Sequence, residues 1–185
     1  VLMKADEDVP CLIRMSSAAA SDVLFLKNIH LPAQSILVFD KGYNSYSDYQ
    51  RFDKENITWI TRKNNHASIE ITKELPVDVQ QRTLGVLKDH LVILGNTTNK
   101  KQIRVEARII TYLDEQTGKL FEFITNNKKM KPSTISQLYQ KRWQIETLFK
   151  RLKQNNQLRY FLGENENAIK IQVWCSLIAD LITKI

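Results

Sequence analysis

The chain has 185 residues, a formal net charge of +7 and a hydrophobic content of 43%. That length and apolar content allow one ordinary domain with a real core, and the charge favours nucleic acid over a membrane surface as partner. The longest apolar stretch, 173–182, contains Ser176 and Asp180 and is too short to cross a bilayer, so we expect no membrane partner. Cys11 and Cys175 match no metal-ligand or redox spacing and are interpreted as buried thiols.

Patterns in the first third of the chain predict alternating strands and helices. In chain order they are a hairpin (1–4 and 11–15), a helix capped by Asp22, a strand (35–39), a helix (47–54) and a strand (57–61). Apart from Ser35, the run 35–39 is apolar, which is typical of a strand buried in the middle of a sheet.

The second part of the chain has a different character. Short, polar, β-leaning segments fill residues 66–116 and predict a β-rich insertion. A strand is expected over 120–125, then a long helix opening at Pro132, and a final helix over 167–182. Thr134 and Gln137 have the spacing of a capping box at the start of the long helix.

Four polar side chains follow one another along the predicted long helix. Tyr139, Arg142, Glu146 and Lys153 are separated by three, four and seven residues. With about 3.6 residues per turn, these spacings place them within an arc of roughly 60° on one face. A carboxylate that can hold a metal would then lie among a phenol and two cations, which suits cleavage of a phosphodiester. The alternative is a solvated helix face, in which Lys150 pairs with Glu146.

Asp40 is a second candidate. It ends the predicted strand 35–39 and is followed by Lys41 and Gly42. A carboxylate at the carboxyl end of a strand points into the crevice where open α/β sheets place their sites. The alternative is a loop aspartate that caps the next helix or pairs with Lys41.

These residues, taken in order, resemble a known family. Asp40-Lys-Gly-Tyr43, then a strand ending at Arg62, then Tyr139-x2-Arg142-Trp143-x2-Glu146-x6-Lys153, is similar to the DDE transposases of bacterial insertion sequences. Within them the pattern most resembles the insertion-sequence-4-like group, named for its Tyr-Arg-Glu-Lys helix motif. The resemblance implies an α/β fold: an RNase H-like mixed sheet flanked by helices. Residues 1–65 and 117–185 would form this core, and 66–116 would be an insertion between the second acidic residue and the catalytic glutamate.

The resemblance also implies a chemistry and partners. Asp40 and Glu146 would be catalytic metal ligands that, with one more aspartate, hold Mg²⁺, with Mn²⁺ as an alternative. Tyr139, Arg142 and Lys153 would bind the DNA of the transposon end, and Arg62 would add a contact. The activity would be cut-and-paste transposition by metal-dependent cleavage and strand transfer. The full-length protein would act as a homodimer in a synaptic complex, in the bacterial cytoplasm and associated with the nucleoid.

One departure from the family pattern concerns its first aspartate, which lies on a strand before the opening hairpin. Asp6 and Asp8 fall at the hairpin turn, the wrong end of the strand, and Asp22 is explained as a helix cap. We therefore expect a fragment, incomplete at both ends, that carries two of three ligands and is inactive alone. The alternative is a non-catalytic DNA-binding remnant or a competitor of an intact transposase. The helix motif argues against a third reading, a resolvase-like nuclease.

Overall fold

The computed structural model describes two compact units. The terminal unit comprises Val1–Ala18 with Lys141–Ile185, and the sheet unit comprises Ala19–Gln140. The residues described are 1–5, 7, 9–13, 15, 23–96, 103–155, 158, 160–163 and 165–183. The expectations for Asp6, Asp8 and Asp22 lie outside these residues.

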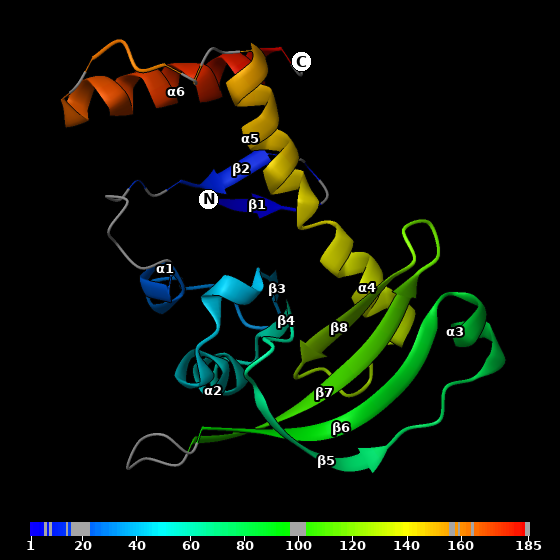
Figure 1. Ribbon diagram of the computed structural model, residues 1–185. Helices are drawn as coiled ribbons and strands as arrows, with labels where there is room; N and C mark the ends of the chain where they lie inside the picture. The colour runs from blue at the N-terminus through cyan, green and yellow to red at the C-terminus, as the bar shows by residue number, and fades with distance from the viewer. Residues whose placement is uncertain are drawn as a thin grey trace. The chain divides into compact units, whose positions relative to one another are not determined.

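A six-stranded mixed sheet organises the sheet unit (Figure 1), and its strand order is β3-β4-β8-β7-β6-β5. Strands β3 and β4 are parallel, and the other neighbours are antiparallel. The strands are β3 (Ile36–Val38), β4 (Thr58–Arg62), β5 (Ser68–Glu74), β6 (Val86–Asn96), β7 (Ile103–Asp114) and β8 (Lys119–Thr125). The helices are α1 (Val23–Lys27), the 3-10 helix η1 (Lys41–Tyr43), α2 (Tyr46–Lys54), α3 (Val79–Thr83) and α4 (Pro132–Gln140). A mixed sheet flanked by helices was the predicted architecture.

Helices α2 and α4 cover opposite faces of this sheet. Successive residues of a strand point to opposite sides, so neighbouring residues of β4 contact different helices. On β4, Trp59 stacks on Tyr49 of α2 with ring centroids 4.1 Å apart. The next residue, Ile60, joins a buried cluster with Ile135 and Tyr139 of α4. The two faces of β4 thus carry two different helices, and the α4 face is the one that bears on the candidate site.

Strand β3 corrects one expectation. It is the terminal strand of the six-stranded sheet rather than a middle strand, and Ile36 is exposed. Leu37 is nevertheless buried. An apolar run shows that a strand has a buried side, but it does not show whether both of its edges are paired.

The predicted insertion contains one element that the sequence patterns did not indicate. Helix α3 lies between β5 and β6, and Asp78 caps it by accepting a hydrogen bond from the Gln81 amide at 2.7 Å. The chain then turns into β6 at Gly85, where φ is +88° and an added Cβ would lie 2.4 Å from the Leu113 carbonyl oxygen. Only glycine fits that turn. Strands β5, β6 and β7 continue the same sheet as β4 and β8.

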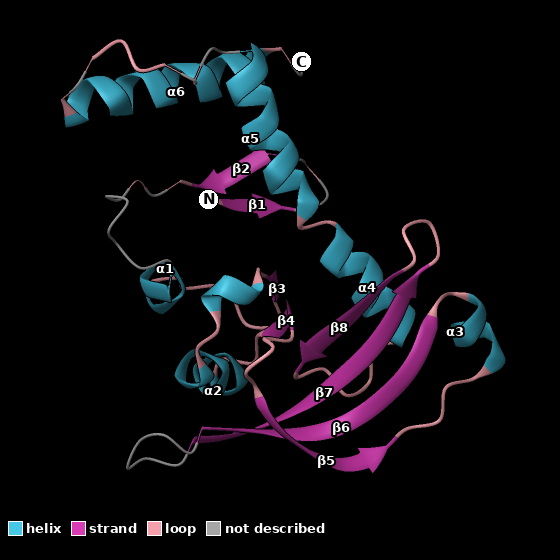
Figure 2. Cartoon of the chain, viewed as in Figure 1, coloured by secondary structure: helices cyan, strands magenta, loops and turns pink. Residues whose placement is uncertain are grey.

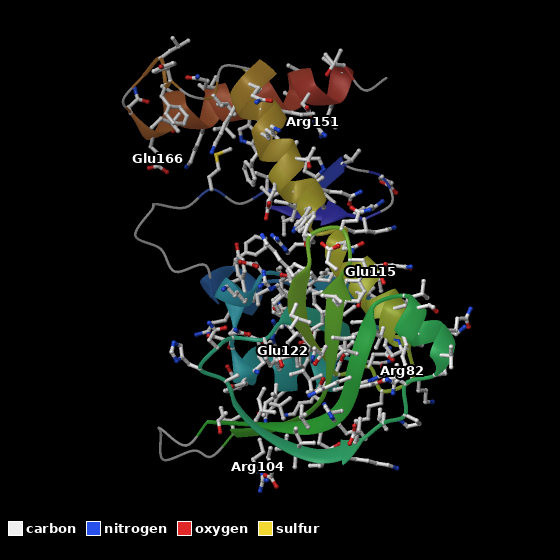
Figure 3. The ribbon with its side chains drawn as sticks, turned by 45° about the vertical axis from the view of Figure 1, so that its right-hand side comes forward. Arg82, Arg104, Glu115, Glu122, Arg151 and Glu166 are labelled. Atoms are coloured by element: carbon white, nitrogen blue, oxygen red, sulfur yellow. The ribbon has the colours of Figure 1, made fainter. Side chains whose placement is uncertain are left out.

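The terminal unit combines a hairpin with two helices. Its elements are β1 (Leu2–Lys4), β2 (Val9–Leu12), α5 (Trp143–Asn155) and α6 (Glu166–Ile182). The predicted hairpin and final helix are both present. Leu148, Leu152 and Leu177 form its buried cluster. Arg151 of α5 (Figure 3) donates to the buried Asp180 of α6, with Nε 3.1 Å from Oδ1.

The predicted single long helix is wrong. Helix α4 ends at Gln140 and α5 begins at Trp143, and the two are drawn as separate helices in Figure 2. The first amides of α5 donate hydrogen bonds to the carbonyls three residues earlier, those of Lys141 and Arg142. The i to i−4 hydrogen bonding of an α-helix is therefore interrupted at this point.

Two smaller expectations also fail. Thr134 lies inside α4, which begins at Pro132, so it does not cap the helix. Cys11 and Cys175 are both exposed rather than buried.

Candidate active site

Asp40 lies at the carboxyl edge of the parallel pair β3 and β4. Val38 pairs with Ile60, and the Phe39 amide continues the ladder by donating to the Ile60 carbonyl at 3.1 Å. Two residues beyond that pair come Asp40, just after β3, and Arg62, the last residue of β4. Because side chains alternate along a strand, this register directs both residues to the face that α4 covers.

The phenol of Tyr139 contacts Asp40. The Tyr139 hydroxyl donates to Asp40 Oδ1 at 3.3 Å, although the two residues are 99 positions apart. The Tyr139 side chain is 4% exposed, and its ring lies 4.8 Å from that of Phe123 on β8. A buried hydroxyl requires a partner, and the carboxylate oxygen supplies one. Two of the candidates chosen from the sequence are thus brought into contact by the fold.

The capping role considered for Asp40 is not what its side chain does. Asp40 occupies the N-cap position of η1, but its side chain makes no capping hydrogen bond. Ser45 caps the following helix instead, by accepting from the Asp48 amide. Beside Asp40, a Cβ at Gly42 would lie 4.0 Å from Oδ2, so residue 42 leaves that oxygen unobstructed.

Arg62 is held at this edge by an aromatic ring. Its guanidinium carbon lies 5.0 Å from the centroid of Phe121 on β8. Phe121 in turn stacks on Phe123, the ring that contacts Tyr139. Within the part of the chain that the structure describes, Arg62 makes no ion pair with a carboxylate. A stacked guanidinium keeps its N–H groups available for an oxyanion.

The terminal unit carries the other three candidates. Arg142 Nη2 lies 2.8 Å from Glu146 Oε1, and the two side chains are 14% and 63% exposed. The partner that the structure gives Glu146 is therefore Arg142 rather than Lys150. Glu146 and Lys153 line the same open pocket of about 470 Å³, together with Phe149, Lys150 and Gln154. An acidic and a basic candidate thus share one side of α5.

The six candidates fall into two groups of three. Asp40, Arg62 and Tyr139 belong to the sheet unit, whereas Arg142, Glu146 and Lys153 belong to the terminal unit. Each group is assembled within its own unit. That the two groups form one site stays a prediction.

The donor chemistry of these carboxylates suits a hard cation. Mg²⁺ prefers carboxylate oxygens and is commonly bound by one or two of them, with water in its other positions. Asp40 and Glu146 offer such oxygens. Among the residues that the structure describes, no group of three or more His, Cys, Asp or Glu side chains is placed to hold a metal ion.

Sequence reasoning missed three buried polar side chains behind this site: Gln81, Asp89 and Arg108. Asp89 and Arg108 lie in strands whose other inward residues are apolar. A charged residue at a core position of a strongly β-patterned run is the signal that could have found them. Their contacts lead to the start of α4.

No helix within the described ranges is both long enough and apolar enough to cross a membrane.

Comparison with known proteins adds independent evidence. A family model described as "Transposase DDE domain" matches residues 15–181. "Putative transposase y4zB" of Sinorhizobium fredii is 27% identical over 186 residues, covering 100% of this chain and 52% of the relative. "Putative transposase for insertion sequence element IS4SA" of Synechocystis is 30% identical over 162 residues, covering 83% of this chain and 42% of the relative. "Probable transposase for insertion sequence element IS5377" of Geobacillus stearothermophilus is 25% identical over 152 residues, covering 82% and 39%. The chain spans about half the length of the curated relatives it matches.

Proposed function

Because the chain belongs to the transposase DDE domain family, we propose that it forms part of the catalytic apparatus of a DNA transposase. The proposed activity is cut-and-paste transposition, with metal-dependent cleavage and strand transfer at transposon ends. The observation that carries the proposal is the hydrogen bond from Tyr139 to Asp40. It joins a member of the Tyr-Arg-Glu-Lys motif to the acidic residue that precedes it by 99 positions.

Asp40 and Glu146 are the proposed metal ligands. The metal would be Mg²⁺, with Mn²⁺ as an alternative, because both ligands are carboxylates. A divalent ion at such a site supplies activation of the attacking oxygen and stabilisation of the leaving oxygen. Tyr139 holds Asp40 by donating to Oδ1. In the same way, Arg142 holds Glu146 through Oε1.

Arg62, Arg142 and Lys153 are the proposed phosphate contacts, and Tyr139 would join them at the transposon end. Cations beside a phosphodiester neutralise the charge that grows during in-line displacement. Arg62 has the planar donor fork that matches phosphate oxygens, and its stacking on Phe121 orders that fork.

The finer assignments follow from the motif order. We propose that the chain belongs to the insertion-sequence-4-like group and has an RNase H-like core of residues 1–65 and 117–185. Residues 66–116 would be the insertion, and the whole protein would act as a homodimer. The parallel pair β3 and β4, with Asp40 at its carboxyl edge, supports such a core. Since β3 is the terminal strand, we also propose that a strand pairing with its other edge completes the ligand set with a third carboxylate.

Binding of the purified chain to a DNA duplex over a range of salt concentrations tests the proposal. Affinity should fall as salt rises, because each cation that meets a phosphate releases counterions. Arg142→Ala and Lys153→Ala should each weaken binding and lower the salt slope by about 1. Lys128→Ala is a matched control, since Lys128 is an exposed cation paired with Glu106. No DNA affinity at low salt, or equal effects in all three variants, would contradict the proposal.

Nicking of supercoiled plasmid in Mg²⁺ and in Mn²⁺ separates the leading function from the alternative. Metal-dependent nicking that is lost in Asp40→Ala and in Glu146→Ala supports a catalytic role for this chain. DNA binding without nicking favours the non-catalytic alternative, a remnant or competitor of an intact transposase. Nicking that survives both substitutions would refute the site assignment.

A further inference from the structure

A buried ion pair joins β6 and β7 behind the candidate site. Arg108 Nε donates to Asp89 Oδ1 at 2.8 Å, and Arg108 Nη2 donates to Asp89 Oδ2 at 2.6 Å. The two side chains are 5% and 3% exposed. A buried pair of this kind is weak evidence for stability, because apolar side chains of similar volume often serve as well.

The remaining donor group of Arg108 reaches the loop that leads into α4. Arg108 Nη1 donates to the Met130 carbonyl at 2.6 Å and, more weakly, to the Asn127 carbonyl at 3.4 Å. Asn127 folds the same loop by accepting from the amides of Lys129 and Met130 at 3.0 and 2.8 Å. Asp89 fixes the guanidinium plane, and the guanidinium fixes the loop. An apolar pair could fill the volume but could not bond to these carbonyls.

The first turn of α4 has a second anchor. The Ser133 amide donates to Gln81 Oε1 at 2.9 Å, and the Gln81 side chain is buried. Helix α3 thus caps α4 with a side chain from outside the helix, which satisfies one of the amides that a helix start leaves unpaired. The start of α4 is therefore fixed on both sides, at the Met130 carbonyl before it and at the Ser133 amide within it.

The rotation of α4 about its own axis sets the direction of the Tyr139 side chain, and that rotation is fixed where the helix starts. A slip of one residue turns a helical side chain by about 100°. Tyr139 lies in the second turn after Ser133, and its hydroxyl meets Asp40 at 3.3 Å. A rotation of that size would carry the hydroxyl away from the carboxylate.

We infer that Arg108 is a positioning residue: with Asp89 it fixes the Met130 carbonyl, sets the rotation of α4, and so places the Tyr139 hydroxyl on Asp40. Its importance for catalysis rests on the proposed function, whereas its effect on the Tyr139 contact does not. Gln81, on α3, helps to fix the same rotation of α4 through its contact with the Ser133 amide.

The test is ¹⁹F NMR of the full chain with 3-fluorotyrosine at position 139. Asp40→Ala provides the reference resonance for a phenol without its acceptor. The variant Arg108→Met with Asp89→Leu should move the resonance at least about halfway towards that reference, while thermal unfolding stays cooperative. A purely structural pair would change the unfolding temperature and leave the resonance of the folded protein in place.

Two further variants keep the test decisive. Arg108→Lys retains the charge facing Asp89 but cannot also reach Met130, so it too should move the resonance if the double variant does not fold. Lys128→Ala is the matched control, because Lys128 and Glu106 join the same loop to the same strand at the surface. A resonance unchanged in folded Arg108→Lys, or moved equally by Lys128→Ala, overturns the inference.

The same spectra separate this inference from the proposed function. If Mn²⁺ broadens the wild-type resonance, a metal binds near Tyr139 as proposed. If Mn²⁺ has no effect but the Arg108 variants still move the resonance, the proposed metal binding by this chain fails and the positioning role stands.

Discussion

Tyr139 and Glu146, one from each group of candidate residues, differ sharply in how far they are buried. In the sheet unit, Tyr139 is 4% exposed and hydrogen-bonded to Asp40 beneath α4. In the terminal unit, the Glu146 side chain is 63% exposed on the surface of α5. In the first group, Tyr139 is part of the core, whereas Asp40 and Arg62 are half-buried at the strand ends. In the second group, Glu146 and Lys153 are exposed on α5, whereas Arg142 is half-buried just before that helix.

Replacing Tyr139 by alanine should have the largest effect on stability. The substitution leaves a cavity beside Phe123 and Ile135, and large aromatic deletions of this kind cost about 3–5 kcal/mol. Urea denaturation followed by tryptophan fluorescence would measure the loss. A cost below about 1 kcal/mol would show that Tyr139 is not the core residue described here.

Replacing Tyr139 by phenylalanine isolates the contact with Asp40. The ring stays, and only the hydrogen bond to a charged acceptor is lost, so the free energy of unfolding should fall by about 1.5 kcal/mol. The matched variant is Asp40→Ala with Tyr139→Phe. Its loss should be smaller than the sum of the two single losses, and strict additivity would argue against the contact.

Glu146→Gln should change stability much less than either tyrosine substitution. A pair at spacing i,i+4 whose carboxylate is 63% exposed contributes about 0.3–0.5 kcal/mol. The free energy of unfolding, measured as for Tyr139, should therefore fall by no more than that. A loss comparable to that of Tyr139→Phe would remove the contrast between the two groups.

The smallest effect concerns Glu106, whose pKa is lowered by its hydrogen bond and charge interaction with Lys128. A carboxyl whose folded-state pKa is depressed contributes stability above its unfolded value of 4.5. That contribution is lost as pH falls through the lower folded-state pKa. Wild type should therefore lose slightly more stability than Lys128→Ala below pH 4.5, by about 0.2 kcal/mol, the low end for exposed pairs. An identical pH dependence would contradict the pairing.

Local patterns in the sequence predicted many of the helices and strands. The hairpin, β3, α2, β4, β8 and α6 all follow from apolar periodicity and caps, which are local properties of the chain. The choice of Asp40 and Tyr139 rested on a strand end and a motif, and the fold brings the two together.

Features that depend on distant partners could not be predicted in this way. The interruption between α4 and α5 lies in a run without Gly or Pro, so periodicity continued across Lys141 and Arg142. The cap of α4 comes from Gln81, 52 positions away. Arg108 and Asp89 are 19 positions apart on neighbouring strands, and their pairing depends on the register of β6 and β7.

The most direct test of the central claim is Mn²⁺ affinity of the purified chain, measured by titration calorimetry for wild type, Asp40→Asn and Glu146→Gln. Both substitutions keep side-chain size and remove one negative charge. If Asp40 and Glu146 bind one ion, each substitution alone should lower the affinity at least about tenfold, or about 1.4 kcal/mol. If either variant binds Mn²⁺ as tightly as wild type, the two carboxylates do not share a metal site and the account is contradicted.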